Sequence, residues 1–143
     1  MQEIQKNEEL SLEELAAKLP PLKEDDSEAI AQAAHDALYQ KKARHIEVYK
    51  VEGKSDIADY MVVATGTSST HVKALAAEVE HYLGLRGLAA RHTEGRDNSA
   101  WVLVDYGSVI VHVQSRDARE FYHLDRLYGG VAAEKAEMDE KEQ

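Results

Sequence analysis

The loop from Thr65 to His71, with the sequence TGTSSTH, contains the residue types that could hold a phosphate group. It lies between an apolar run and a helical pattern, where free backbone N–H groups and the helix dipole favour an anion. The candidate anion-binding residues are Gly66, Ser68 and Ser69. However, the loop matches neither of the glycine-rich nucleotide-binding patterns. An ordinary strand-to-helix turn also needs a glycine and a capping hydroxyl, so we favour a structural turn.

A metal-dependent transferase would also need two carboxylates one residue apart on a strand, so that both face the same metal ions. The pair in range, Glu78 and Glu80, lies in a predicted helix. Residues two apart on a helix point roughly 200° apart around its axis, so these carboxylates could not share a metal. A nucleotidyl- or phosphate-transferring enzyme that uses residues 65–71 remains the alternative function, but it lacks metal holders.

Other catalytic and metal-binding patterns are missing from the sequence. The seven His include no i, i+4 pair, and the chain has no Cys for a thiolate site or a nucleophile. No Gly-x-Ser-x-Gly elbow is present for a serine nucleophile. We therefore predict no catalytic residue, no metal site and no cofactor, and we do not expect an enzyme.

Aromatic and charged residues gather around the stretch EGRDNSAWVLVDYGSVIVHV, residues 94–113, which contains the single Trp. Trp and Tyr often carry the binding energy of protein interfaces. Trp101 either packs on the last helix or faces a partner, and the residues alone leave these two readings equal. The set comprises Glu94, Trp101, Asp105, Tyr106, Phe121, Tyr122 and Tyr128.

The elements that would position these residues follow from the spacing of apolar side chains. The order α-β-β-α-β-β-β-α predicts an α/β fold with a mixed sheet of about five strands and flanking helices. Ser27 is the candidate N-cap of the first core helix, and Phe121, Leu124 and Leu127 are expected to face inward from the last one. The predicted helices span about 27–43, 68–87 and 115–130, and the predicted strands 45–51, 58–66, 88–93, 101–106 and 108–113, the last two joined by a tight turn.

The charge divides the chain into a core, residues 27–130, and two acidic ends, residues 1–26 and 131–143. The net charge is −10, and these ends carry 13 of the 27 acidic residues. A capping box that starts at Ser11 predicts a short helix over 12–19. We favour mobile ends over docked ones, because short charged segments bury little apolar surface.

The composition also limits the partners and the compartment. The core shows no basic stripe, so we expect no direct DNA binding, and a basic protein partner suits the acidic chain better. No apolar run approaches the roughly 20 residues that cross a bilayer, and no secretory signal is visible. We therefore expect a cytoplasmic protein that does not bind membranes.

Three segments together resemble the ribosomal silencing factor family, also called Iojap-related. They are GKSDIADYMVVATGTSSTHVKALA at 53–76, Glu94-Gly95 followed by WVLVDYGSVIVHV at 101–113, and REFYHLDRLY at 119–128. The resemblance covers residues 27–130 and implies a fold related to nucleotidyltransferases without their catalysis. It also implies binding to the large ribosomal subunit through its protein numbered fourteen. The bound factor would sterically block association with the small subunit and repress translation.

The resemblance also assigns a contact patch. Trp101 and Asp105 match the strand of the family, with Glu94 beside it, and Tyr122, Leu127 and Tyr128 match its final helix and the turn that follows. The chain departs from the family at Tyr128, where a Trp is usual, and at Gln114, where an apolar residue is usual. We expect a monomer or a weak homodimer.

Overall fold

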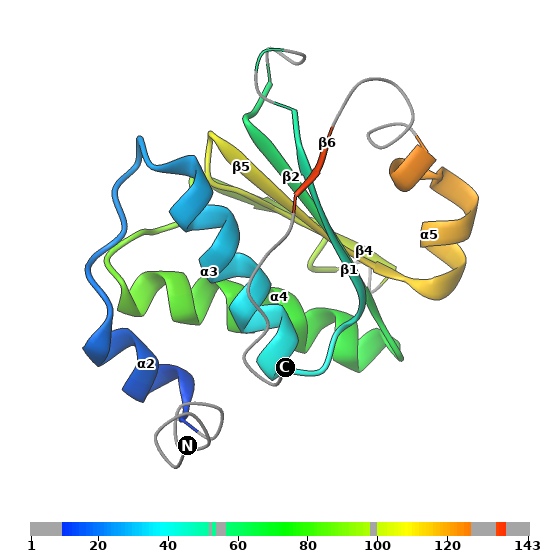
Figure 1. The fold of residues 1–143 in the computed structure, drawn as a ribbon. Helices are drawn as coiled ribbons and strands as arrows, with labels where there is room; N and C mark the ends of the chain where they lie inside the picture. The colour runs from blue at the N-terminus through cyan, green and yellow to red at the C-terminus, as the bar shows by residue number, and fades with distance from the viewer. Residues whose placement is uncertain (1–9, 52, 54–56, 98–99, 127–133, 137–143) are drawn as a thin grey trace, which may run out of the picture.

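The computed structural model describes residues 10–51, 53, 57–97, 100–126 and 134–136. In them, one mixed sheet separates two layers of helices: α3 and α4 lie on one face, and α5 lies on the other (Figure 1). This arrangement confirms the predicted fold class. The elements are α2 (Leu12–Lys18), α3 (Ser27–Gln40), β1 (Arg44–Lys50), β2 (Tyr60–Gly66), α4 (Ser69–Leu85), β3 (His92–Glu94), β4 (Trp101–Asp105), β5 (Val109–Ser115), α5 (Arg116–Tyr122) and β6 (Glu134–Ala136).

The sheet has the strand order β3-β4-β5-β2-β1-β6. Strand β2 lies in the interior, antiparallel to β1 and parallel to β5, while β4 and β5 form an antiparallel hairpin. Every residue of β2 is buried. The continuous apolar run in this part of the sequence therefore reflects a strand that is covered on both faces.

The five expected strands are present, and the acidic tail adds a sixth. Residues Glu134–Ala136 pair antiparallel with β1, with Val48 opposite Ala136 and Lys50 opposite Glu134. The prediction of a mobile tail is therefore wrong for these three residues. The physical reason is that backbone N–H and C=O groups on a free strand edge pair with any extended chain, whatever its side chains.

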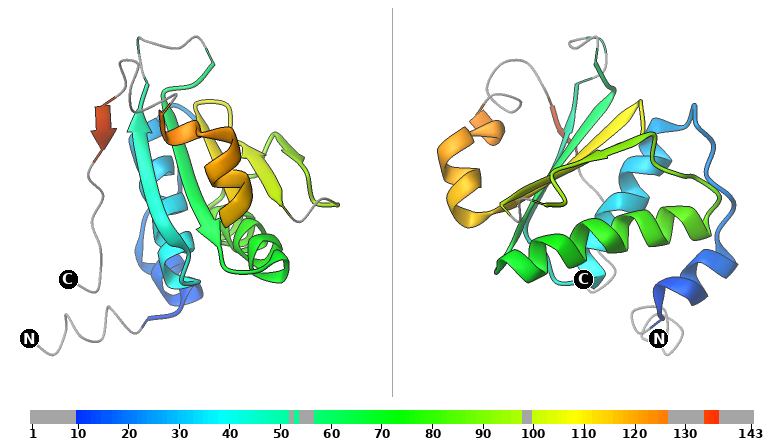
Figure 2. Two further views of the ribbon diagram at one scale, coloured as in Figure 1. Left: turned by 90° about the vertical axis from the view of Figure 1, so that its right-hand side faces the viewer. Right: turned by 180° about the vertical axis from the view of Figure 1, so that it is seen from behind.

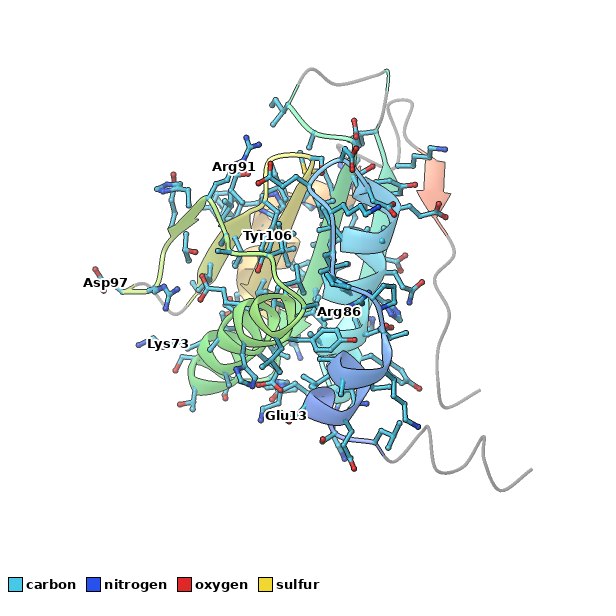
Figure 3. All side chains as sticks on the ribbon, turned by 90° about the vertical axis from the view of Figure 1, so that its left-hand side faces the viewer. Glu13, Lys73, Arg86, Arg91, Asp97 and Tyr106 are labelled. Carbon is cyan, nitrogen blue, oxygen red and sulfur yellow. The ribbon has the colours of Figure 1, made fainter. Side chains whose placement is uncertain are left out.

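The acidic N-terminal segment is docked rather than mobile from residue 10 onward. Helix α2 begins with the predicted capping box, and its Leu12 and Leu15 are buried in the main core. Arg86, at the end of α4, donates two hydrogen bonds to the carbonyl of Pro20 (Figure 3). The prediction of a mobile arm is wrong here, because α4 offers an apolar surface that the local sequence does not reveal.

Two helix boundaries differ from the predictions, and one agrees. Helix α3 is capped by Asp26, whose carboxylate accepts from the N–H of Ala29, so Ser27 is its first residue and not its N-cap. This helix ends at Gln40, three residues earlier than expected. Helix α4 has Ser68 as its N-cap, one of the two candidates, Ser68 and Ser69, that the sequence offers. None of the helices in the described part of the chain is long and apolar enough to cross a membrane.

The last helical segment is shorter than predicted and faces differently. Helix α5 stops at Tyr122, because His123 adopts a left-handed backbone conformation with φ of 57°. Leu124 is buried as expected, but Phe121 is 75% exposed and does not face inward. The expectation for Phe121 assumed one continuous helix through residue 127, and Leu127 itself lies outside the described residues.

A candidate docking face beside the last helix

Strand β4 presents alternate residues to the two faces of the sheet. Val102 and Val104 are completely buried in the core under α3 and α4. Because residues two apart share a face, Trp101, Leu103 and Asp105 point toward the α5 side, where all three are only partly buried. Trp101 is therefore neither a core residue under α3 and α4 nor a free surface residue.

The α5 side of the sheet carries a second, smaller apolar cluster. Helix α5 lies over only part of this face, as Figure 2 shows from two directions. Trp101 and Leu103 pack at the border of the cluster and remain partly exposed. The buried members are Tyr49, Val51, Ala58, Met61, Val63, Ile110 and Leu124.

Three aromatic rings line up from the sheet to solvent. The Trp101 ring lies 4.5 Å from that of Tyr122 between centroids, and the Tyr122 ring lies 5.0 Å from that of Phe121 in an edge-on arrangement. Tyr122 is 52% exposed. Exposed aromatic groups held in fixed contact are typical of binding surfaces, because they lose little conformational entropy on association.

His112, on the neighbouring strand β5, contacts the Trp101 ring and accepts a hydrogen bond from it. The Trp101 Nε1–H donates to His112 Nδ1 at 3.1 Å, so this nitrogen carries no proton of its own. Burial lowers the pKa of His112 to about 4, which keeps the imidazole neutral near pH 7. Protonating Nδ1 would break the contact that orients Trp101.

Four of the six predicted contact residues share this face. Glu94 lies opposite Leu103 in the sheet register, and directly opposite residues project to the same side. Trp101 and Asp105 lie on the same strand as Leu103, and Tyr122 rests on Trp101. The remaining two predictions, Leu127 and Tyr128, lie outside the described residues.

The two acidic residues already have local partners. The Asp105 carboxylate accepts from the N–H of Gly107 at 2.7 Å, which shapes the hairpin turn. The Glu94 carboxylate contacts His92 Nε2 at 2.7 Å and is well exposed. Asp105 therefore has a structural role that does not depend on any partner, whereas Glu94 is accessible.

The sequence reasoning missed two residues of this surface. Leu103 was not singled out, although it shares the alternation of Trp101 and Asp105 and that pattern could have identified it. Phe121 belonged to the aromatic set but was expected to pack inward, and it is 75% exposed. No sequence motif announces the end of α5 at His123.

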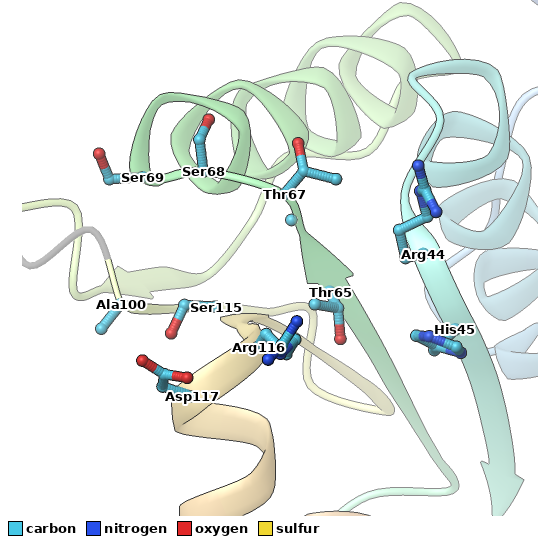
Figure 4. Close-up of a pocket in the computed structure, with 11 residues that line it drawn as sticks. Arg44, His45, Thr65, Thr67, Ser68, Ser69, Ala100, Ser115, Arg116 and Asp117 are labelled. Carbon is cyan, nitrogen blue, oxygen red and sulfur yellow. The ribbon is translucent and has the colours of Figure 1, made fainter.

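The candidate anion-binding turn lies in a separate open cleft. This cleft, of about 780 Å³, lies beyond the carboxyl ends of β2 and β5, and Gly66, Ser68 and Ser69 line it together with Arg44 and Arg116 (Figure 4). Neighbouring parallel strands whose helices leave toward opposite faces form a common ligand crevice in α/β sheets.

The turn residues have structural roles of their own. The Ser68 hydroxyl accepts from the N–H of His71 as the helix cap. A Cβ at Gly66 would lie 2.7 Å from Val72 Cγ2, so a side chain there has no room. The described residues contain no group of three His, Cys, Asp or Glu that could hold a metal ion. These roles favour the structural turn over a phosphate site.

Sequence comparisons relate this chain to one protein family. A family model described as "Ribosomal silencing factor during starvation" matches residues 24–143. A Bacillus subtilis protein named ribosomal silencing factor is 36% identical over 104 residues, which cover 73% of this chain and 88% of the relative. A Haemophilus influenzae protein with the same name is 37% identical over 100 residues, covering 70% of this chain and 98% of that protein.

Solved structures give the same result. A crystal structure of a Chromobacterium violaceum protein superposes with a TM-score of 0.71 at 34% identity and covers 78% of this chain and 93% of its own. A Bacillus halodurans structure gives a TM-score of 0.68 at 30% identity, with 78% and 99% covered. The family model and the solved structures each cover most of the chain, and the chain belongs to the ribosomal silencing factor family.

Proposed function

We propose that this protein binds the large ribosomal subunit through its protein numbered fourteen. The bound protein then obstructs association with the small subunit and represses translation. Family membership supports this proposal, because relatives that cover most of this chain are named ribosomal silencing factors. The function is regulatory, acts through binding, and requires no catalytic group.

The observation that carries the proposal is the exposed aromatic row of Trp101, Tyr122 and Phe121 beside the uncovered part of the sheet. Phe121 and Tyr122 are two of the five large apolar side chains that are exposed in the described residues. Large aromatic side chains that pack into a partner usually carry much of the binding energy. We place the docking face here, with Leu103, Glu94 and Asp105 around it and with Leu127 and Tyr128 as further proposed contacts.

The charge of the chain supports a basic partner. The net charge is −10 at pH 7, and complementary charge mainly raises the rate of association and the specificity of an encounter. We therefore expect binding to the large subunit to weaken as the ionic strength rises.

The direct test of the contact face is co-sedimentation with purified large subunits at fixed salt. Trp101→Ala is expected to weaken binding by about 2–4 kcal/mol, the range for a central aromatic anchor. Leu85→Ala is the matched control, because it truncates a 44% exposed apolar side chain at the end of α4, on the helix layer away from α5. Full binding by a folded Trp101→Ala protein would remove Trp101 from the contact face.

The steric part of the proposal needs a second assay. Small and large subunits are mixed with and without the protein, and the joined fraction is measured by gradient sedimentation. We expect the joined fraction to fall in proportion to the bound protein. An unchanged joined fraction at saturating binding would contradict the block while leaving the binding intact.

One observation, the cleft beside Ser68 and Ser69, favours a different function, nucleotidyl or phosphate transfer. This function requires binding of a nucleoside triphosphate with a divalent ion, and Ser68→Ala would abolish it. Calorimetry that shows no heat of binding with the four nucleoside triphosphates and Mg²⁺ would remove this alternative.

Sedimentation velocity of the purified protein decides between a monomer and a weak homodimer.

A further inference from the structure

Apolar packing contributes little to the attachment of helix α5 to the sheet. It is seven residues long, and Ala118 is its single buried residue. Helices of this length are marginal without tertiary contacts. The position of Tyr122 at its end therefore depends on some other interaction.

Arg119 supplies that interaction from the middle of α5. Its Nη1 donates to the carbonyl of His45 at 2.5 Å and to the hydroxyl of Thr65 at 2.9 Å. Its Nε and Nη2 donate to the two carboxylate oxygens of Asp125 at 2.7 and 2.6 Å. One guanidinium thus joins α5 to β1, to β2 and to the segment that follows the helix.

The network extends to a second point on β1. The Tyr49 hydroxyl donates to Asp125 at 2.8 Å. Burial by itself would raise the pKa of Asp125, but the hydrogen bonds from Arg119 and Tyr49 outweigh it and hold this pKa below its ordinary value. The Arg119 side chain is 12% exposed, so water screens the pair less than it would at an open surface.

We infer that Arg119 is a positioning residue for the docking face: it fixes α5 on the first residues of β1 and the last residues of β2 and thereby holds Tyr122 against Trp101. Residues three apart on a helix are neighbours on its surface, so a displacement of Arg119 moves Tyr122 with it. A planar, forked donor is needed, because the acceptors lie on three separate segments. The positioning role follows from the contacts of Arg119 alone, and only its expected effect on ribosome binding rests on the proposed function.

Trp101 gives a direct readout of this role, because it is the single Trp in the chain. We expect Arg119→Gln to shift the Trp101 emission to longer wavelength and to increase its quenching by acrylamide, as the Tyr122 ring leaves. Arg119→Lys retains the charge but not the fork, and it is expected to restore the wild-type emission only in part.

Arg116 offers a matched control on the same helix. Its side chain is 83% exposed and lies 4.0 Å from the Glu120 carboxylate, and it makes no hydrogen bond or ion pair with β1 or β2 in the part of the chain that the structure describes. Arg116→Gln removes the same charge and is expected to leave the Trp101 emission unchanged. If Arg119→Gln fails to fold, Tyr49→Phe removes one hydrogen bond of the network and keeps the ring, and a smaller change in the same direction is expected.

Binding to purified large subunits is measured with the same variants. Arg119→Gln is expected to bind about tenfold more weakly or worse, while Arg116→Gln retains binding. Wild-type emission and quenching in a folded Arg119→Gln protein would overturn the inference. If Arg119→Gln shows altered Trp101 emission but binds large subunits as well as the wild type does, the claimed consequence for ribosome binding is overturned. If the wild-type protein itself does not bind large subunits, the proposed function is refuted, and altered emission in Arg119→Gln still supports the positioning role.

Discussion

The buried histidine under Trp101 makes the stability of this protein depend on pH in a defined window. His112 is 5% exposed, and burial lowers its pKa from 6.5 to about 4. In the unfolded chain the pKa returns to its ordinary value. As the pH falls below about 6.5, His112 is therefore protonated in the unfolded state but stays neutral in the folded state. The free energy of unfolding falls as a result.

The size of this loss follows from the two pKa values. Each unit of difference is worth about 1.4 kcal/mol once the unfolded state is fully protonated and the folded state is not. At pH 5 the contribution of His112 amounts to about 2 kcal/mol of lost unfolding free energy. The loss levels off below about pH 4, where the folded protein also binds the proton.

The assay compares wild-type protein with His112→Gln by urea unfolding at pH 7 and pH 5. Gln can still accept the Trp101 N–H but does not ionise in this range. The other titrating groups are common to both proteins, so their contributions cancel in the difference. We expect the wild type to lose about 2 kcal/mol more than the variant. Equal losses in the two proteins would refute the buried, neutral His112.

Two further predictions concern single side chains. Gly66→Ala is expected to destabilise the protein by about 1–3 kcal/mol, because its Cβ would meet Val72 at 2.7 Å, whereas Gly84→Ala, with nothing within 4 Å, is expected to stabilise α4 by about 0.5–1 kcal/mol. Urea unfolding of both variants checks this pair, and equal effects would contradict the close-approach argument. Gln114→Met is expected to raise the unfolding free energy by about 1–3 kcal/mol, because the completely buried amide has no hydrogen-bond partner among the described residues. A midpoint of thermal unfolding that falls in this variant would show that the amide is satisfied.

Local patterns predicted the elements whose signals are self-contained. The apolar run of β2 identified an interior strand, and Ser68 identified the start of α4, because a capping hydroxyl acts within its own helical turn. The alternation in β4 is also local: Val102 and Val104 are buried, while Trp101 is half-buried on the other face. Each of these features depends on residues a few positions apart, so its pattern is visible in the amino-acid sequence.

The errors have a common cause in contacts between distant segments. The acidic charge of the N-terminal segment suggested mobility, yet Leu12 and Leu15 are buried because α4 supplies their partner surface. The pairing of β6 with β1 depends on an unfilled sheet edge. Helix α5 ends at Tyr122, earlier than predicted, and its Phe121 is exposed instead of packing inward.

The candidate site divides in the same way. The residue types alone left core packing and a partner interface as equal readings of Trp101, and the family resemblance assigned the contact patch. That Trp101, Tyr122, Glu94 and Asp105 lie on one face of the sheet did not follow from either. The Arg119 network contains a hydrogen bond, Tyr49 to Asp125, between residues 76 positions apart in the chain. Such a cluster forms only when the strands are brought into register.

The amino-acid sequence by itself determined the order of the core elements, the central strands, the caps of α2 and α4 and the family motifs, because these depend on local periodicity and on residue type. The tertiary structure alone decided which part of the sheet α5 leaves partly exposed, how α5 is held, and that Trp101 stands half-buried between His112 and Tyr122. Those outcomes depend on the pairing and packing of segments that are far apart in the chain, and hydrophobic burial and strand pairing between distant segments leave no local pattern to read.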